Sequence, residues 1–313
     1  MDTSRLEYEQ RVNRVIDHVQ AHLAGDLSLE RLARVAAFSP FHFHRIFRAI
    51  TGETLSTFVQ RLRLERAALA LVHRRDDSVL AVALDHGFAS AATFARAFRG
   101  HFGMSATAWR AGGARHWSQP GRADRKLSKA NRKPGKATRG GRRHGGSRPL
   151  RKEGTMNVAV KDLPRYRVAY MRHVGPYGAH GIPELWERFR AWGERRGLGG
   201  PDAIKLGIAH DDPEVTPPEK CRYDACLVVS ESFEPDKWVN IGEVPAGRYA
   251  VMEFVGSPHT IREAWEGLYR SWLPGSGYQP DDRPCVEIYR GNPDVAGRPG
   301  TFRCELAMPV RPL

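Results

Sequence analysis

The chain has 313 residues and a formal net charge of +14. This length suffices for two ordinary domains with separate hydrophobic cores. No apolar run approaches membrane-spanning length, the first residues lack the basic and apolar regions of a signal peptide, and four cysteines without such a signal are typical of reduced thiols. The sequence therefore argues against a membrane or secreted protein and predicts a cytoplasmic one.

Residues 27–48 predict a helix-turn-helix unit. A short amphipathic helix over residues 27–36 leads through a tight turn to a second helix that begins at Ser39, a residue suited to N-capping. Apolar residues of this second helix fall on one side, and Arg45 falls on the other. In helix-turn-helix proteins the second helix enters the major groove of DNA while the first crosses the backbone.

The same pattern recurs 51 residues later, where a helix that begins after Ser90 carries Arg96 at the position of Arg45. Residues 55–73 lie between the two units and predict a helix of about 19 residues, roughly 28 Å long. This helix would set the distance between the two second helices. The apolar positions expected in the core are Phe43, Ile46, Phe47, Phe94, Ala97 and Phe98.

These residues resemble the AraC/XylS-type DNA-binding domain over about residues 8–111. The likeness includes the paired units, Gly52, the stretch Asp85-His86-Gly87-Phe88, and the close from Phe102-Gly103-Met104-Ser105 to Trp109-Arg110. The resemblance implies that one monomer inserts both second helices into adjacent major grooves of double-stranded DNA. It also implies an activator that contacts RNA polymerase, although the sequence itself does not show the sign of regulation.

The predicted DNA contacts come from the two second helices: Phe41, His42, His44, Arg45, Arg48, Thr93, Arg96 and Arg99. We expect Arg45 and Arg96 to contact bases, and an arginine bidentate to guanine is worth about 1–3 kcal/mol of discrimination. The histidines face phosphate, solvent or bases, and Arg48 and Arg99 face phosphate or solvent. Alanines occupy positions 91, 92 and 95, where polar base contacts often occur in the family, so hydrogen-bond readout should be weaker there.

Residues 114–155 predict a disordered basic linker. They hold 14 Lys and Arg against 2 Asp and Glu, whereas residues 1–113 hold 15 against 11 and residues 156–313 hold 20 against 22. Few apolar residues interrupt the Gly, Ser and Pro, so the segment cannot bury enough surface to offset its ordering entropy. It is either a plain spacer or a spacer that also adds sequence-independent affinity for DNA; we favour the second.

Residues 156–313 predict an α+β domain of two pseudo-symmetric strand-helix-strand repeats around one antiparallel sheet. Alternating strands replace the helical spacing, as in residues 167–174, and the tryptophan-rich stretch that follows recurs 80 or 81 residues later. Such a duplication places two helices on one face of the sheet and a groove on the pseudo-twofold axis. Grooves of this kind bind small molecules.

This half resembles the GyrI-like effector-binding domain over about residues 157–313. The matching stretches are Val174-Gly175-Pro176-Tyr177, His210-Asp211-Asp212-Pro213, Cys221-Arg222-Tyr223-Asp224-Ala225-Cys226 and Cys285-Val286-Glu287-Ile288-Tyr289. The resemblance implies a pocket with one acidic residue and several aromatic rings that binds cationic or amphipathic aromatic compounds. Glu287 matches the acidic position.

Strand alternation favours the same residue. Glu287 shares a face with Cys285 and Tyr289, and a carboxylate among rings is costly unless a positive group pairs with it. A lipophilic cation would satisfy it through charge pairing and cation–π contact. The alternative is an internal ion pair with Arg222 or Arg290. We expect Tyr223, Trp265 and Tyr269 in the pocket wall, although each tryptophan alone is more typical of core packing.

The sequence thus predicts a ligand-responsive, sequence-specific DNA-binding transcriptional regulator that is not an enzyme and needs no metal or cofactor. Two alternatives remain. A GyrI-like hydrolase of reactive small molecules could use a Glu-Tyr pair to activate water, and an architectural protein could bind DNA without sequence preference. A long linker transmits orientation poorly, so we expect the ligand to act through inter-domain contact, stability or partner recruitment.

Overall fold

The computed structural model describes residues 3–115, 117, 156–178, 181–291, 293–295, 298 and 300–313. Most of the predicted linker over residues 114–155 lies outside these ranges, so its disorder and its affinity for DNA stay predictions. Phe41 is described in its backbone only.

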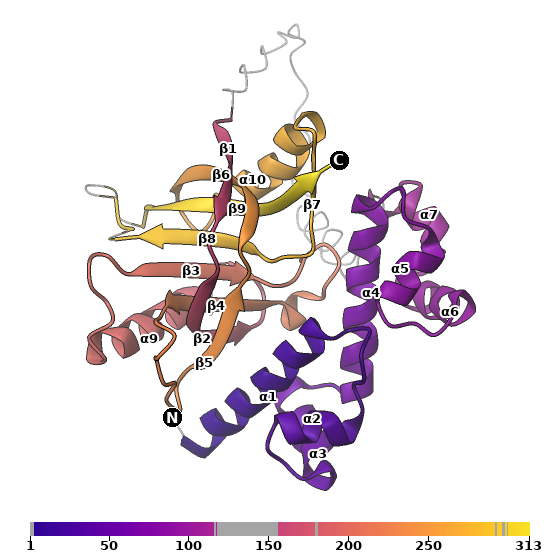
Figure 1. Ribbon diagram of the computed structural model, residues 1–313, viewed down its shortest axis with the longest axis horizontal. Coiled ribbons are helices and arrows are strands. Elements are labelled where there is room, and N and C mark those ends of the chain that lie inside the picture. Colours follow the sequence, from indigo (N-terminus) through magenta and orange to yellow (C-terminus); the bar gives the residue numbers. More distant parts are fainter. Residues whose placement is uncertain are drawn as a thin grey trace, which may run out of the picture.

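The N-terminal half is all-helical, as predicted (Figure 1). Its elements are α1 (Thr3–Ala21), α2 (Leu29–Val35), α3 (Pro40–Thr51), α4 (Leu55–His73), α5 (Val79–Asp85), α6 (Ala91–Phe102), α7 (Ala106–Arg110) and the 3₁₀ turn Gly113–Arg115. The helix pairs α2–α3 and α5–α6 form the two helix-turn-helix units, and α4 runs between them. No helix within the described ranges is long and apolar enough to cross a membrane.

Local sequence explains where the two recognition helices, α3 and α6, begin and end. Ser90 caps α6, because its Oγ accepts a hydrogen bond from the backbone N–H of Thr93. Ser39 holds the equivalent position before α3, but its side chain makes no cap. The backbone N–H of His42, which the Ser39 hydroxyl would cap, donates to the Ser39 backbone carbonyl instead. Both helices end at a glycine with φ of 72°, Gly52 and Gly103, a left-handed conformation that glycine adopts without strain.

Helix α4 contributes to two hydrophobic cores. Its first half packs Phe58, Val59 and Leu62 with α1, α2 and α3, and its second half packs Leu64 to Leu71 with α5, α6 and α7. The predicted core residues behave as expected: Phe43, Phe47, Phe94 and Phe98 are fully buried, and Ile46 and Ala97 are partly buried. Because one helix belongs to both cores, it fixes the two recognition helices relative to one another.

The C-terminal half is an antiparallel sheet with two helical segments on one face, which confirms the predicted α+β class. Its elements are β1 (Val158–Leu163), β2 (Tyr166–Val174), α9 (Ile182–Arg195), β3 (Ile204–Ala209), a 3₁₀ turn (Pro218–Lys220), β4 (Arg222–Val228), β5 (Asn240–Val244), β6 (Gly247–Gly256), α10 (Ile261–Gly267), a π-helical turn (Leu268–Trp272), a 3₁₀ turn (Leu273–Gly275), β7 (Tyr278–Pro280), β8 (Cys285–Arg290) and β9 (Phe302–Pro312). The strand order is β1-β6-β9-β8-β3-β4-β2-β5, and β7 pairs with β9. The second tryptophan-rich helix is thus shorter than its sequence suggests, because it widens into a π turn after Gly267.

The sheet consists of two related halves, as the sequence repeat predicts. The central strands β3 and β8 begin 81 residues apart, and they pair antiparallel with Gly207 opposite Glu287. Each half also lends one strand to the other, since β1 pairs with β6 and β5 pairs with β2. The helical segments α9 and α10 approach each other at Trp186, which packs in the hydrophobic clusters of both halves. Glu287 therefore lies near the pseudo-twofold axis.

The sheet domain lies against helices α1 and α4 of the helical domain (Figure 1). Helices α5, α6 and α7 lie on the side of α4 that is turned away from the sheet. The arrangement leaves recognition helix α6 uncovered by the sheet domain.

Candidate DNA-contact surface and effector site

The recognition helices expose the side chains that the sequence assigns to DNA. The exposed residues are His42, His44, Arg45 and Arg48 on α3, and Thr93, Arg96 and Arg99 on α6. The apolar faces of α3 and α6 are buried in the two hydrophobic cores described above. Arg45 and Arg96, the two predicted base readers, are therefore accessible. Their contact with bases stays a prediction.

Thr93 has a second role that the sequence did not indicate. Its hydroxyl lies 3.0 Å from the Ser90 hydroxyl, and its N–H is capped by the same oxygen. The Thr93 hydroxyl is therefore engaged at the start of α6. That hydrogen-bond readout by α6 depends mainly on Arg96 stays a prediction.

Two of the predicted effector residues, Tyr223 and Trp265, contact the carboxylate of a third, Glu287. Glu287 Oε2 accepts hydrogen bonds from the Tyr223 hydroxyl at 2.7 Å and from the Tyr289 hydroxyl at 2.9 Å. The Trp186 indole N–H in turn donates to the Tyr223 oxygen at 3.2 Å. Trp265 also interacts with the carboxylate. Strand alternation brings Glu287 and Tyr289 to one face of β8, and Tyr223 reaches them from β4.

Burial dominates the electrostatics of Glu287. Only 9% of the residue is exposed, and burial raises the pKa of its carboxyl above the usual value, although the phenol hydrogen bonds oppose that rise. Among the described residues, Glu287 forms no ion pair with either arginine that the sequence offered as a partner. Arg222 pairs with Asp211 at 2.5 Å, and Arg290 lies 3.3 Å from Glu305. Phenol hydroxyls, and no ion pair among the described residues, thus hold this carboxylate.

Several aromatic rings lie around the carboxylate. The Trp186 and Tyr289 ring centroids are 5.4 Å apart, and those of Tyr177 and Tyr223 are 6.4 Å apart, both in edge-to-face geometry. The predicted wall residue Tyr269 lies farther out, and its hydroxyl is 3.2 Å from Cys285 Sγ. The sequence missed Trp186, Tyr177 and Tyr289 as wall residues. Tyr289 could have been found from its place two residues after Glu287.

A cavity of about 2890 Å³ contains all four predicted effector residues. This volume exceeds that of an ordinary ligand pocket, roughly 300–1,000 Å³. It continues into the space between the domains, where His73 and Arg66 of α4 join its lining. The His73 ring centroid lies 6.4 Å from that of Tyr269. The pocket around Glu287 therefore opens toward the helical domain.

No group of three or more His, Cys, Asp or Glu side chains in the described part of the chain is arranged to hold a metal ion. The four cysteines are free thiols. Burial raises the pKa of the Cys285 thiol to about 11, which makes it a poor nucleophile at neutral pH.

Both halves of the chain are similar to known protein families. The family model of the GyrI-like small molecule binding domain matches residues 156–311. The relative named "Probable transcriptional regulator YgiV", of Escherichia coli (strain K12), is 34% identical over 141 residues, which is 43% of this chain and 84% of that protein. The chain belongs to the GyrI-like family. A protein named "DNA gyrase inhibitor", of Edwardsiella piscicida, is 29% identical to the GyrI-like half over 160 residues, 50% of this chain and 99% of that protein.

A family model of the helix-turn-helix domain matches residues 32–112, so the GyrI-like domain here follows a helix-turn-helix domain, as predicted. In this half the chain is 35% identical over 103 residues to "Uncharacterized HTH-type transcriptional regulator YbfP" of Bacillus subtilis (strain 168). That match covers 33% of this chain and 35% of that protein.

Proposed function

We propose that this protein is a transcriptional regulator that binds a specific double-stranded DNA site through α3 and α6 and responds to a lipophilic cation in the Glu287 pocket. The observation that carries the proposal is the buried Glu287 carboxylate, held by two phenols in an aromatic cavity on the same chain as a helix-turn-helix domain. RNA polymerase is the proposed protein partner, activation the proposed sign, and the cytoplasm the proposed location.

The chemistry of the pocket supports a cation. A buried ionised carboxylate without a counter-ion is costly, and a bound positive charge would remove that cost. Faces of Trp and Tyr rings carry negative potential and attract cations, with gains of about 0.5–2 kcal/mol for each contact. A large apolar cation also needs the apolar surface that the rings of Trp186, Tyr269 and Tyr289 supply.

Two probes of nearly equal size and shape test the ligand class. Tetraphenylphosphonium is a lipophilic cation, and tetraphenylborate is its anionic counterpart. Titrations that follow tryptophan fluorescence of the full chain should show binding of the cation and not of the anion. Glu287→Gln should reduce this preference by at least tenfold. Equal affinity for the two ions, or a preference that survives Glu287→Gln, would contradict the proposed ligand class.

A selection of bound duplexes from random sequence tests the DNA half. A regulator enriches one site that spans two successive major grooves, whereas an architectural protein enriches none. Catalysis is not part of the proposal; of the two Glu287 carboxylate oxygens, Oε2 already accepts hydrogen bonds from both Tyr223 and Tyr289. Turnover of an aromatic ester by the full chain that disappears in Glu287→Gln would favour the hydrolase instead.

A further inference from the structure

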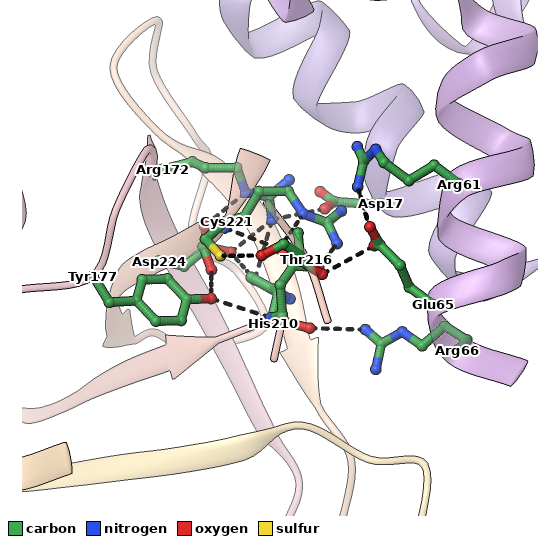
Figure 2. A network of polar contacts seen from close by, with 12 residues as sticks. Asp17, Arg61, Glu65, Arg66, Arg172, Tyr177, His210, Thr216, Cys221 and Asp224 are labelled. Atoms are coloured by element: carbon green, nitrogen blue, oxygen red, sulfur yellow. Dashed lines mark hydrogen bonds and ion pairs between the residues drawn. The ribbon is translucent and has the colours of Figure 1, made fainter. Parts of the chain in front are cut away.

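The loop between β3 and β4, residues 210–221, docks the GyrI-like domain onto α4. Val215 is buried and packs in the same hydrophobic cluster as the second half of α4. Next to it, the Thr216 hydroxyl donates a 3.0 Å hydrogen bond to Glu65 Oε2, and the Arg66 guanidinium donates to the His210 carbonyl at 3.0 Å (Figure 2). At the end of the loop, the Lys220 ammonium donates to the Thr51 carbonyl at 2.6 Å. The loop is thus part of the helical domain's core.

A second contact joins the sheet to α1. Arg172 on β2 is almost fully buried, and its guanidinium pairs with Asp224 at 2.7 Å and with Asp17 of α1 at 2.9 Å. The Tyr170 hydroxyl also donates to the Asp17 carboxylate. One buried cation is therefore shared between a carboxylate of each domain, and removal of either carboxylate would leave it undercompensated.

Strand β4 forms a wall that both sites share. Successive side chains of a strand point to opposite faces, and here Arg222 and Asp224 face the docking contacts whereas Tyr223 faces the pocket. The Arg222 guanidinium lies 5.9 Å from the Phe58 ring of α4. The Tyr223 hydroxyl, one residue away, holds Glu287. A ligand that moves Tyr223 would therefore also move β4, and the opposite face of β4 contacts the helical domain through Arg222.

Tyr177 strengthens the connection between the two faces. Its hydroxyl donates to the Arg222 carbonyl at 2.7 Å and accepts from the Asp211 N–H at 3.1 Å, while its ring packs against Tyr223. Asp211 in turn pairs with the Arg222 side chain. A displacement of the Tyr223 ring is therefore passed to the first residues of the docking loop.

We infer that docking of the 210–221 loop on α4 and filling of the Glu287 pocket oppose each other, so that a bound cation loosens the contact between the domains. Glu287 is only 9% exposed, so a ligand that pairs with it displaces the Tyr223 hydroxyl, and the pocket opens toward α4, where the His73 and Tyr269 ring centroids lie 6.4 Å apart. Because α4 belongs to the cores of both helix-turn-helix units, its release changes how α3 and α6 are presented to DNA. The inference builds on the proposed function and specifies how the site is regulated.

The first experiment needs no ligand. Cys221 is buried at the docking contact, where its Sγ lies 3.8 Å from the Thr216 carbonyl oxygen (Figure 2). Cys226 is buried within the sheet. Labelling of the full chain with a maleimide, followed by mass spectrometry, reports undocking at Cys221 and unfolding of the sheet at Cys226. Tyr223→Phe removes the β4 phenol that holds Glu287, and we expect Cys221 to be labelled about fivefold faster, with Cys226 unchanged.

Tyr289→Phe is the matched control, because it removes the other phenol bound to the same oxygen but lies on β8. It should leave the labelling of Cys221 at the wild-type rate. Equal rates for wild type, Tyr223→Phe and Tyr289→Phe would overturn the inference, as would equal acceleration by both variants.

The second experiment tests the reverse direction, since coupling between two sites is reciprocal. Thr216→Val with Lys220→Gln weakens docking, and we expect the double variant to bind tetraphenylphosphonium about fivefold more tightly than wild type. Ser230→Ala with Lys205→Gln makes the same change of charge and removes hydrogen bonds of 3.1 and 3.5 Å inside the GyrI-like domain, and it should bind as wild type does. Unchanged affinity in the docking variant would overturn the inference while the proposed function stands. If no variant binds the cation, the ligand class fails, and the cysteine labelling still decides whether β4 controls docking.

Discussion

The Tyr223 hydroxyl on β4 reaches the Glu287 carboxylate on β8, at 2.7 Å, across the intervening strand β3. The contact is possible because β3 has Gly207 at this point. A Cβ atom there would lie 2.5 Å from Glu287 Oε2 and closer still to the Tyr223 oxygen. The pocket thus depends on a position that carries no side chain.

Gly207→Ala should therefore separate the pair. Because both neighbours are buried and bonded, we expect a loss of about 1–3 kcal/mol in the free energy of unfolding. Because the new Cβ occupies the space beside the Glu287 carboxylate, we also expect at least a tenfold weaker affinity for tetraphenylphosphonium. Denaturant unfolding and fluorescence titration measure the two effects. Gly193→Ala is the control, since a Cβ on that α9 glycine meets nothing within 4 Å and alanine favours a helix; a comparable loss there would contradict this explanation.

Cation binding should weaken on acidification. Burial raises the pKa of Glu287, so the carboxylate takes up a proton at a higher pH than an exposed one does. Only the ionised form attracts a cation, and the affinity should fall up to tenfold for each pH unit below the raised pKa. Isothermal titration between pH 8 and pH 5 measures this slope. In Glu287→Gln the slope should vanish, and a slope that persists would assign the titration to another group.

The stability of the docked protein should also depend on pH through Glu65. Burial raises the pKa of Glu65 to about 7, although Arg61 opposes the rise. A carboxyl with a raised pKa in the folded state favours folding fully below its unfolded pKa, and this contribution is lost as pH rises through the folded value. We expect the free energy of unfolding to fall by about 2 kcal/mol between pH 5 and pH 8. Thermal or urea unfolding of Glu65→Gln should lack this component.

Loss of both predicted base readers should remove site preference. Arg45→Ala with Arg96→Ala changes exposed residues, so the fold should persist while discrimination falls by about 1–3 kcal/mol for each arginine. Footprinting on the selected site measures this. Arg48→Ala with Arg99→Ala is the contrast: it should weaken binding to all sequences and reduce the salt slope by about one for each phosphate that the variant no longer neutralises. An unchanged footprint in the first variant would mean that other residues select the site.

Local sequence patterns were enough to predict the helices of the N-terminal half and the strand face on which Glu287 lies. The 51-residue repeat predicted two equivalent recognition helices, and strand alternation placed Glu287 and Tyr289 on one face. The resemblance to known families supplied the ligand class, which the spacing of residues alone did not.

The docking contact could not be predicted, because it pairs residues far apart in the chain. Arg61 and Glu65 are four apart on a helix, a spacing typical of an exposed surface pair. They are buried instead, because Thr216 and its loop cover them from 151 residues away. The spacing of residues in α4 therefore does not indicate that the loop buries Arg61 and Glu65.

The exchange of edge strands has a consequence for how the proposed ligand site is assembled and how it is lost. Strand β1 completes the second repeat and β5 completes the first, so neither copy is a finished unit. Cleavage between residues 229 and 239 would yield two fragments that must recombine before the β3–β8 junction, and with it the acidic site, exists at all. The proposed recognition of a small molecule is thus a property of the whole sheet and of neither half alone.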